Sequence, residues 1–167
     1  MATPTTLPAA FVSGNVLTAA QLNDLRGAFR VLQVVQGVTS TAVTNNTNVQ
    51  ADTGLTATIT PQSASSKILV LVSQVGCEKS PSNAGNGVNL YLYRDATQIQ
   101  QFANAGNYTN SLLQMISSFP TIYLDSPATT SATTYKTTFA NFTNAAAVLV
   151  QVTSAPQSTI TLVEISA

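Results

Sequence analysis

Residues 55–61 read LTATITP, and residues 68–75 read ILVLVSQV. In the first segment apolar residues alternate with threonines until Pro61, and this period of two is typical of a strand with one buried face. The second segment is almost continuously apolar, as expected of a strand that is buried on both faces. The abundance of valine, isoleucine and threonine favours strands elsewhere in the chain as well.

Further strand-like segments are separated by turns rich in Ser, Asn, Gly and Pro. In residues 88–93 apolar positions alternate with polar or aromatic ones, and the turn at residues 94–96 predicts a hairpin with residues 97–102. About nine or ten strands of this length favour a mainly β fold, an antiparallel jelly-roll-like β-sandwich, with an immunoglobulin-like sandwich as the alternative. The other predicted strands are residues 31–36, a weak one near Val43, and residues 112–119, 121–124, 134–141, 148–153 and 158–165.

The N-terminal segment differs from the rest of the chain. Its first sixteen residues contain Pro4, Pro8 and Gly14 among Thr and Ala and predict an extended arm. Thr18 and Gln21 have the spacing of a capping box, which predicts one short α-helix of about ten residues. We therefore expect an N-terminal attachment arm and helix over residues 1–35 and a β-sandwich domain over residues 36–167. The candidate attachment residues of the arm and helix are Phe11, Leu17, Leu22, Leu25 and Phe29.

The composition is poor in charge. Charged residues make up 7% of the chain, six basic and six acidic, whereas an average soluble domain contains about 25%. The net charge is zero and no run of like charges occurs, so neither nucleic acid nor an anionic membrane is expected as a partner. Low charge in a strand-rich chain favours burial in an assembly over a free monomer.

The residues that usually carry catalysis are scarce. The chain contains no histidine, so the common proton shuttle and most nucleophile-base pairs are missing. Its one cysteine, Cys77, is expected to be a small buried side chain. We therefore predict a protein that is not an enzyme and has no catalytic, cofactor-binding or metal site. A carbohydrate-active enzyme is the alternative, because two of the six scattered carboxylates can still meet in the folded chain.

Tyr91 and Tyr93 are two residues apart in a predicted strand and therefore share one face. We expect this face to be buried against a neighbouring subunit, with each hydroxyl bound to a partner. The alternatives are an ordinary surface or core position and an aromatic platform on which a sugar stacks. Both tyrosines are thus candidate interface residues.

Several segments together resemble virion proteins of tailed bacteriophages that are described as tail fibres or minor structural proteins. In the resembling hairpins Gly often follows Asp, where this chain has Ala96. The segments that carry the resemblance are FVSGNVLTAAQLN (residues 11–23), ITP (59–61), SSKILV (65–70), LYRD (92–95), YLDSP (123–127), TTYK (133–136) and STITLVEI (158–165).

The resemblance implies a non-enzymatic component of the virion surface that forms a homotrimer. Its arm and helix attach to the major capsid protein or another virion protein, while the β-domain faces outward. A chain of this length is short for a fibre that must reach a receptor, which favours a capsid decoration or cement protein at the capsid surface. The alternative is a tail-fibre or receptor-binding adhesin that recognises host surface glycans.

Overall fold

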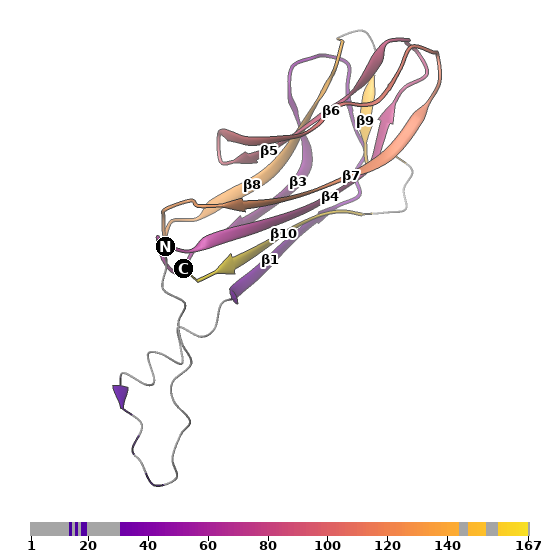
Figure 1. Ribbon diagram of the computed structural model, residues 1–167. Helices are drawn as coiled ribbons and strands as arrows, with labels where there is room; N and C mark the ends of the chain where they lie inside the picture. Colours follow the sequence, from indigo (N-terminus) through magenta and orange to yellow (C-terminus); the bar gives the residue numbers. More distant parts are fainter. Residues whose placement is uncertain are drawn as a thin grey trace.

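The computed structural model of the chain describes residues 14, 16, 18, 19, 31–143, 147–152 and 157–166. Ten strands lie in this part, and all pairs between them are antiparallel (Figure 1). The strands are β1 (Val31–Thr39), β2 (Val43–Asn45), β3 (Ala51–Ile59), β4 (Lys67–Lys79), β5 (Asn86–Arg94), β6 (Thr97–Thr109), β7 (Met115–Asp125), β8 (Thr133–Asn141), β9 (Val148–Val150) and β10 (Ser158–Ile165).

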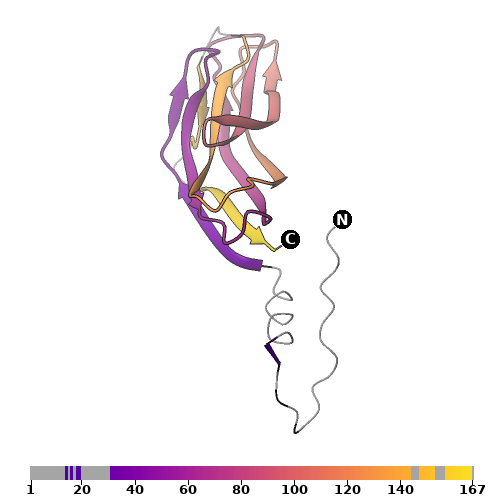
Figure 2. The same cartoon turned by 90° about the vertical axis from the view of Figure 1, so that its left-hand side faces the viewer.

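The strands form two sheets that pack face to face (Figures 1 and 2). Sheet A has the order β1-β10-β4-β9-β2, with β7 along the other edge of β4, and sheet B has the order β3-β8-β5-β6. When the short β2 and β9 are set aside and the eight long strands are numbered along the chain, sheet A reads 1-8-3-6 and sheet B reads 2-7-4-5. This interleaving of two Greek keys is the jelly roll, so the predicted fold class is confirmed.

The pairing defines two ends of the domain. Val31 of β1, Ile165 of β10 and Lys67 of β4 lie side by side at one end, which we call the terminal end. Lys79 of β4 lies beside Met115 of β7 at the other, the distal end. Figure 1 shows the strands of both sheets running between these ends.

The interior contains two apolar clusters with polar contacts between them. One cluster fills the terminal half and includes Leu55, Ile68 and Leu162, while the other fills the distal half around Phe139 and Val148. A chain of hydrogen bonds crosses the interior between the clusters and joins β3, β8, β4 and β10, so the buried polar groups have partners. Its contacts run from Thr53 Oγ1 to Thr137 Oγ1 (2.6 Å), from Thr137 Oγ1 to Gln74 Oε1 (2.9 Å) and from Gln74 Nε2 to Ser158 Oγ (3.2 Å).

One glycine lets the two sheets approach at an edge. Gly37 of β1 faces the backbone of Thr56 in β3, where a Cβ atom would lie 1.9 Å from the Thr56 carbonyl oxygen. β1 and β3 are edge strands of different sheets. The missing side chain therefore allows close contact between the sheets.

Several predicted strand boundaries are wrong: β4 and β6 extend beyond their predicted ends at residues 75 and 102, and two further differences have a local physical cause. Residues 112–119 and 121–124 were expected as separate strands, but the single strand β7 runs through Pro120. Proline is tolerated in an edge strand, and β7 pairs only with β4 among the described strands. β9 ends at Val150 rather than at residue 153, because the next residue, Gln151, has a φ of 54° and leaves the extended conformation.

The predicted helix lies almost entirely outside the described residues and stays a prediction. The division between residues 35 and 36 also stays a prediction, and β1 contains residues on both sides of it. Within the described part of the chain, no helix is long and apolar enough to span a membrane.

Candidate interaction surface

The outer face of sheet A carries aligned rows of side chains that are largely apolar at its centre. Directly paired residues in an antiparallel sheet point to the same side. Since Ile68, Val70 and Val72 of β4 point into the core, the intervening residues of β4 point outward. The register places Val34, Val163, Leu69 and Leu124 in one row across β1, β10, β4 and β7, and Gln36, Thr161, Leu71 and Ile122 in the next.

These side chains remain accessible in the single chain. The exposed fraction is 59% for Val34, 67% for Ile122 and 56% for Leu124. Leu69 and Val163, in the two central strands, are half-buried. The wholly apolar row through Leu69, together with Leu71 and Ile122 of the next row, therefore forms a continuous patch that no other described segment of the chain covers. We call this patch the sheet A face.

Polar residues border the sheet A face. Toward the distal end, the row of Val38, Thr159, Ser73 and Pro120 places two small polar side chains, Thr159 and Ser73, on the central strands β10 and β4. At the terminal end lies Lys67, whose Nζ donates to Ser126 Oγ at 2.6 Å.

The outer face of sheet B has the opposite character. Tyr91 is paired with Thr138, and Tyr93 with Lys136, in the middle of this sheet. Lys136 Nζ lies 2.7 Å from Asp52 Oδ1 on the neighbouring strand. Hydroxyls, amides and this ion pair make the face polar, so the two faces of the sandwich differ in polarity.

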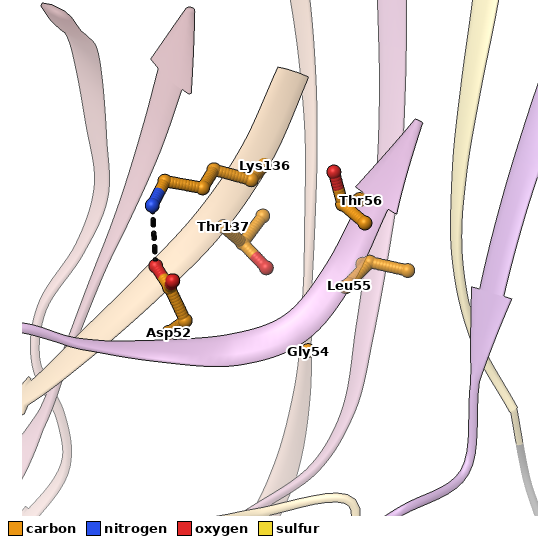
Figure 3. A pocket seen from close by; sticks show the side chains of 6 residues that line it. All are labelled: Asp52, Gly54, Leu55, Thr56, Lys136 and Thr137. Carbon is orange, nitrogen blue, oxygen red and sulfur yellow. Dashed lines mark ion pairs between the residues drawn. The ribbon is translucent and has the colours of Figure 1, made fainter. Parts of the chain in front are cut away.

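A small pocket opens beside the Asp52–Lys136 ion pair (Figure 3). Its volume is about 170 Å³, below the ~300–1,000 Å³ of typical small-molecule sites. It lies where β3 shifts register against β8 between Asp52 and Thr56, around Gly54 with its φ of 82°. Figure 3 shows the Lys136 and Asp52 side chains pointing toward one another at its edge. The pocket is thus a consequence of the irregular pairing, and its size does not suit a substrate.

Acidic side chains at the terminal end stabilise the fold. The Arg94 guanidinium lies 2.9 Å from both carboxylate oxygens of Asp125, and the Tyr135 hydroxyl donates to Asp125 Oδ2 at 2.7 Å. Burial, together with the hydrogen bond to the Asp125 carboxylate, raises the pKa of Tyr135 well above its usual value. The contacts join β7 of sheet A to β5 and β8 of sheet B.

Glu164 has a similar structural role. Its carboxylate accepts hydrogen bonds from the Gln33 side chain and from the Gln62 backbone N–H, the latter at 2.7 Å. Burial by itself raises the pKa of Glu164, but these hydrogen bonds to the charged form outweigh it and hold the pKa below its usual value. Glu164 thereby fixes the loop after β3 against β1 and β10.

The distal end carries a second exposed apolar cluster, which we call the distal tip: Tyr108, Leu112, Leu113, Met115, Ile116 and Phe142. The rings of Tyr108 and Phe142 meet edge to face at 5.8 Å. Lys79 is fully buried below the tip, where its Nζ donates to the carbonyl oxygens of Ser111 (2.8 Å) and Leu113 (3.1 Å). The ammonium group thus anchors the backbone of the loop that presents Leu112 and Leu113.

The residues predicted for an interface lie on neither the sheet A face nor the distal tip in the described part of the chain. Phe11, Leu17, Leu22, Leu25 and Phe29 lie outside the described residues. Tyr91 and Tyr93 do share one face, the outer face of sheet B, and both are half-buried. Their burial against a subunit stays a prediction.

The sheet A face was not predicted as a site. The signal was present in residues 68–75, whose apolar character indicated burial on both faces of the strand. The described part of the chain covers one of these faces. Assembling the patch also requires the pairing of β10 with β1 and β4 and of β4 with β7, which the sequence alone does not show.

The groups able to do chemistry are separated in the described part of the chain. Cys77 is buried, as predicted, and burial raises the pKa of its thiol to about 12. Asp95 accepts a hydrogen bond from the Thr134 N–H at 2.9 Å and so belongs to the hairpin turn. No group of three or more His, Cys, Asp or Glu residues suited to a metal ion occurs among the described residues.

Comparison with known proteins gives distant structural matches. The chain is similar to the crystal structure of the infectious bursal disease virus VP2 subviral particle, with a TM-score of 0.43 and 14% identity over 80% of this chain. It is also similar to the structure of the Gx strain of that virus, with a TM-score of 0.36 and 13% identity over 82% of this chain. The chain spans 32% and 38% of the length of these two proteins. No protein-family model and no curated protein matches the sequence.

Proposed function

We propose that this chain is a non-enzymatic structural protein of a bacteriophage virion. In this proposal it is a homotrimeric decoration or cement protein that docks on the capsid shell through its N-terminal arm and helix. Its partners are further copies of itself and the major capsid protein or another virion protein. The assignment to a phage rests on the sequence resemblance described above.

The observation that carries the structural role is the unequal polarity of the two sandwich faces. A continuous apolar patch on a folded domain usually marks an interaction site. Val34, Ile122 and Leu124 remain accessible in the single chain, whereas the other face carries the partly exposed Asp52–Lys136 ion pair. The domain thus has the surface of a subunit designed for assembly.

The positions of the carboxylates favour a non-enzymatic role. A glycosidase needs two carboxyl groups that face one sugar. In this chain Asp125 contacts Arg94 and Tyr135, and Asp52 contacts Lys136. Glu164 accepts hydrogen bonds from the Gln33 side chain and the Gln62 backbone N–H. These contacts hold strands and loops together and leave the carboxyl groups engaged.

Cryo-electron microscopy of intact virions tests the proposal, because it locates the chain and counts its copies. We expect density on the capsid in three-fold clusters, with the N-terminal residues at the shell. Density confined to the tail would contradict the decoration role. A matched variant, Leu22→Ser with Phe29→Ser, is expected to stay trimeric but to fail to attach to particles that lack the protein.

The alternative function is a tail adhesin that binds host glycans, and the distal tip is the observation that favours it. Exposed aromatic rings such as Tyr108 and Phe142 suit stacking against sugars. Under this alternative, purified protein binds host cells and the substitution Tyr108→Ala abolishes that binding. Under the decoration role, neither the protein nor the variant binds cells.

A further inference from the structure

We infer that Glu78, on the outer side of sheet A next to the distal tip, is a recognition site for an arginine side chain of another protein. This site is separate from the proposed attachment through the N-terminal arm and helix, and it goes beyond that function. Two observations support it: a largely buried carboxylate without a partner among the described residues, and aliphatic side chains beside that carboxylate.

The alternation of side chains along β4 turns Glu78 away from the core. Its neighbours Cys77 and Lys79 are both fully buried, and Cys77 belongs to the apolar cluster of the distal half. Because successive side chains of a strand point to opposite faces, Glu78 points to the outer side of sheet A. There it is paired directly with Ile116 of β7 and with Leu149 of β9.

Glu78 is buried but makes no hydrogen bond or ion pair with the described residues, whereas the carboxylates of Asp52, Asp125 and Glu164 all have partners. Only 8% of Glu78 is exposed. In the described part of the chain, Ser66 Oγ is the one fully enclosed side-chain oxygen or nitrogen without a hydrogen bond, so the Glu78 oxygens still meet solvent. Burial of an unpaired charge costs free energy. A cation that approaches from outside would offset this cost.

The side chains beside Glu78 select the kind of cation. A divalent metal ion is held by several oxygen ligands, whereas the paired neighbours Ile116 and Leu149 are aliphatic. The Cβ atoms of directly paired residues lie about 4.5–5.5 Å apart, so both neighbours border the carboxylate. An arginine suits such a site, because its guanidinium is weakly hydrated and binds a carboxylate through two hydrogen bonds. Its apolar stem can pack on Ile116, which is 44% exposed.

The cations of the chain itself are engaged or too far from Glu78. From Lys67 at the terminal end to Glu78, β4 covers roughly 35 Å at about 3.3 Å per residue. Arg26 and Arg30 precede Val31 at the terminal end, and the stretch from Arg26 to Val31 spans at most about 18 Å. Both arginines also belong to the segment that the proposed function places at the capsid shell. The described cations already have partners: Lys67 with Ser126, Lys79 with Ser111 and Leu113, Arg94 with Asp125, and Lys136 with Asp52.

The test uses four heptapeptide libraries on the full chain, with Arg, Lys, Gln or Glu at the central position and Ala, Leu, Val or Ser elsewhere. We expect the arginine library to be retained most strongly. The strongest arginine peptide is then titrated by fluorescence anisotropy against the wild type, Glu78→Gln and the charge-matched control Asp52→Asn. Glu78→Gln should weaken binding at least ~30-fold, because it removes one member of a largely desolvated charge pair. Asp52→Asn, on the other sheet, should leave binding unchanged.

Two further measurements separate recognition from a structural role of Glu78. The urea midpoint of Glu78→Gln should equal or exceed that of the wild type, because the side chain has no described partner to lose. Sedimentation should give the same mass for both proteins. A lower midpoint would make Glu78 a structural residue, and a changed mass would make a second copy the occupant. Either result would overturn the inference, as would equal retention of the four libraries or a peptide that binds Glu78→Gln as well as the wild type.

Discussion

Substitution of Gly37 by alanine is expected to destabilise the domain by forcing its two sheets apart at one edge. The new Cβ atom would lie 1.9 Å from the Thr56 carbonyl oxygen and 3.2 Å from Cγ2 of Ile160. Ordinary contact begins at 3.4 Å, so β1 and β3 must separate by about 1.5 Å. Because the obstacle is backbone, rotation of a side chain cannot relieve the clash.

The magnitude follows from the cost of overpacking. Inserting a methyl group into a closely packed region costs about 1–3 kcal/mol, and the rigid obstacle at Thr56 places Gly37→Ala near the upper end. Alanine also restricts the unfolded chain, which offsets up to about 1 kcal/mol of this loss. We therefore expect the free energy of unfolding to fall by about 2 kcal/mol. In a chain of this size that lowers Tm by about 4–8 °C.

The assay is urea denaturation combined with hydrogen exchange, with Gly54→Ala as the control. Gly54 has a φ of 82° and its added Cβ would meet only Thr39 Oγ1 at 3.8 Å, so the control introduces backbone strain of about 1–2 kcal/mol without a clash. Gly37→Ala should accelerate amide exchange in both β1 and β3, whereas the control should affect β3. A Gly37→Ala protein within 0.5 kcal/mol of the wild type would refute the role of the close approach.

Three further predictions concern buried polar and ionisable groups. Asp125→Asn should lower the free energy of unfolding, measured by urea denaturation, by about 2 kcal/mol because Arg94 loses its carboxylate partner. Arg94 is partly exposed, which keeps the loss below that of a fully buried pair. An unchanged midpoint of the urea transition would count against this network. The pKa of Glu164 is lowered from its ordinary value of 4.5 on folding, so the stability it contributes is present above about pH 4.5 and is lost as the pH falls through the folded-state pKa. The stability advantage of the wild type over Glu164→Gln should therefore shrink from pH 5 toward pH 3, and a constant difference would contradict the assignment. Cys77, whose pKa is raised to about 12 by burial, should resist a thiol reagent at pH 8 in the folded protein and react readily in guanidinium chloride; equal rates would show that the thiol is accessible.

The local pattern of side chains was sufficient to identify most of the strands. Alternation in residues 55–59 and 88–93 placed Leu55, Leu90 and Leu92 in the core, where all three are fully buried. The turn around Asp95 was also predicted, and Asp95 has the positive φ of 51° that a tight hairpin requires. These features depend on neighbours in the sequence, since strand periodicity and turn geometry are local properties.

Other features depend on partners that are distant in the chain. Pro120 was expected to end a strand, but it is tolerated because β7 lies at a sheet edge. The need for glycine at position 37 comes from a carbonyl group nineteen residues away, at Thr56. Neither requirement is visible in the residues next to it.

The sequence by itself determined a charge-poor, histidine-free chain of alternating strands, and with it the β-sandwich and the scarcity of catalytic groups. Only the tertiary structure decided which apolar residues face the core and which remain on the surface. Leu69 and Val70 are equally apolar in the sequence, yet Val70 is buried between the sheets while Leu69 joins Val163 and Leu124 on the outer face. The reason is that hydrophobicity sets the tendency of a side chain to leave water, whereas strand register and sheet order determine which neighbour is available to cover it.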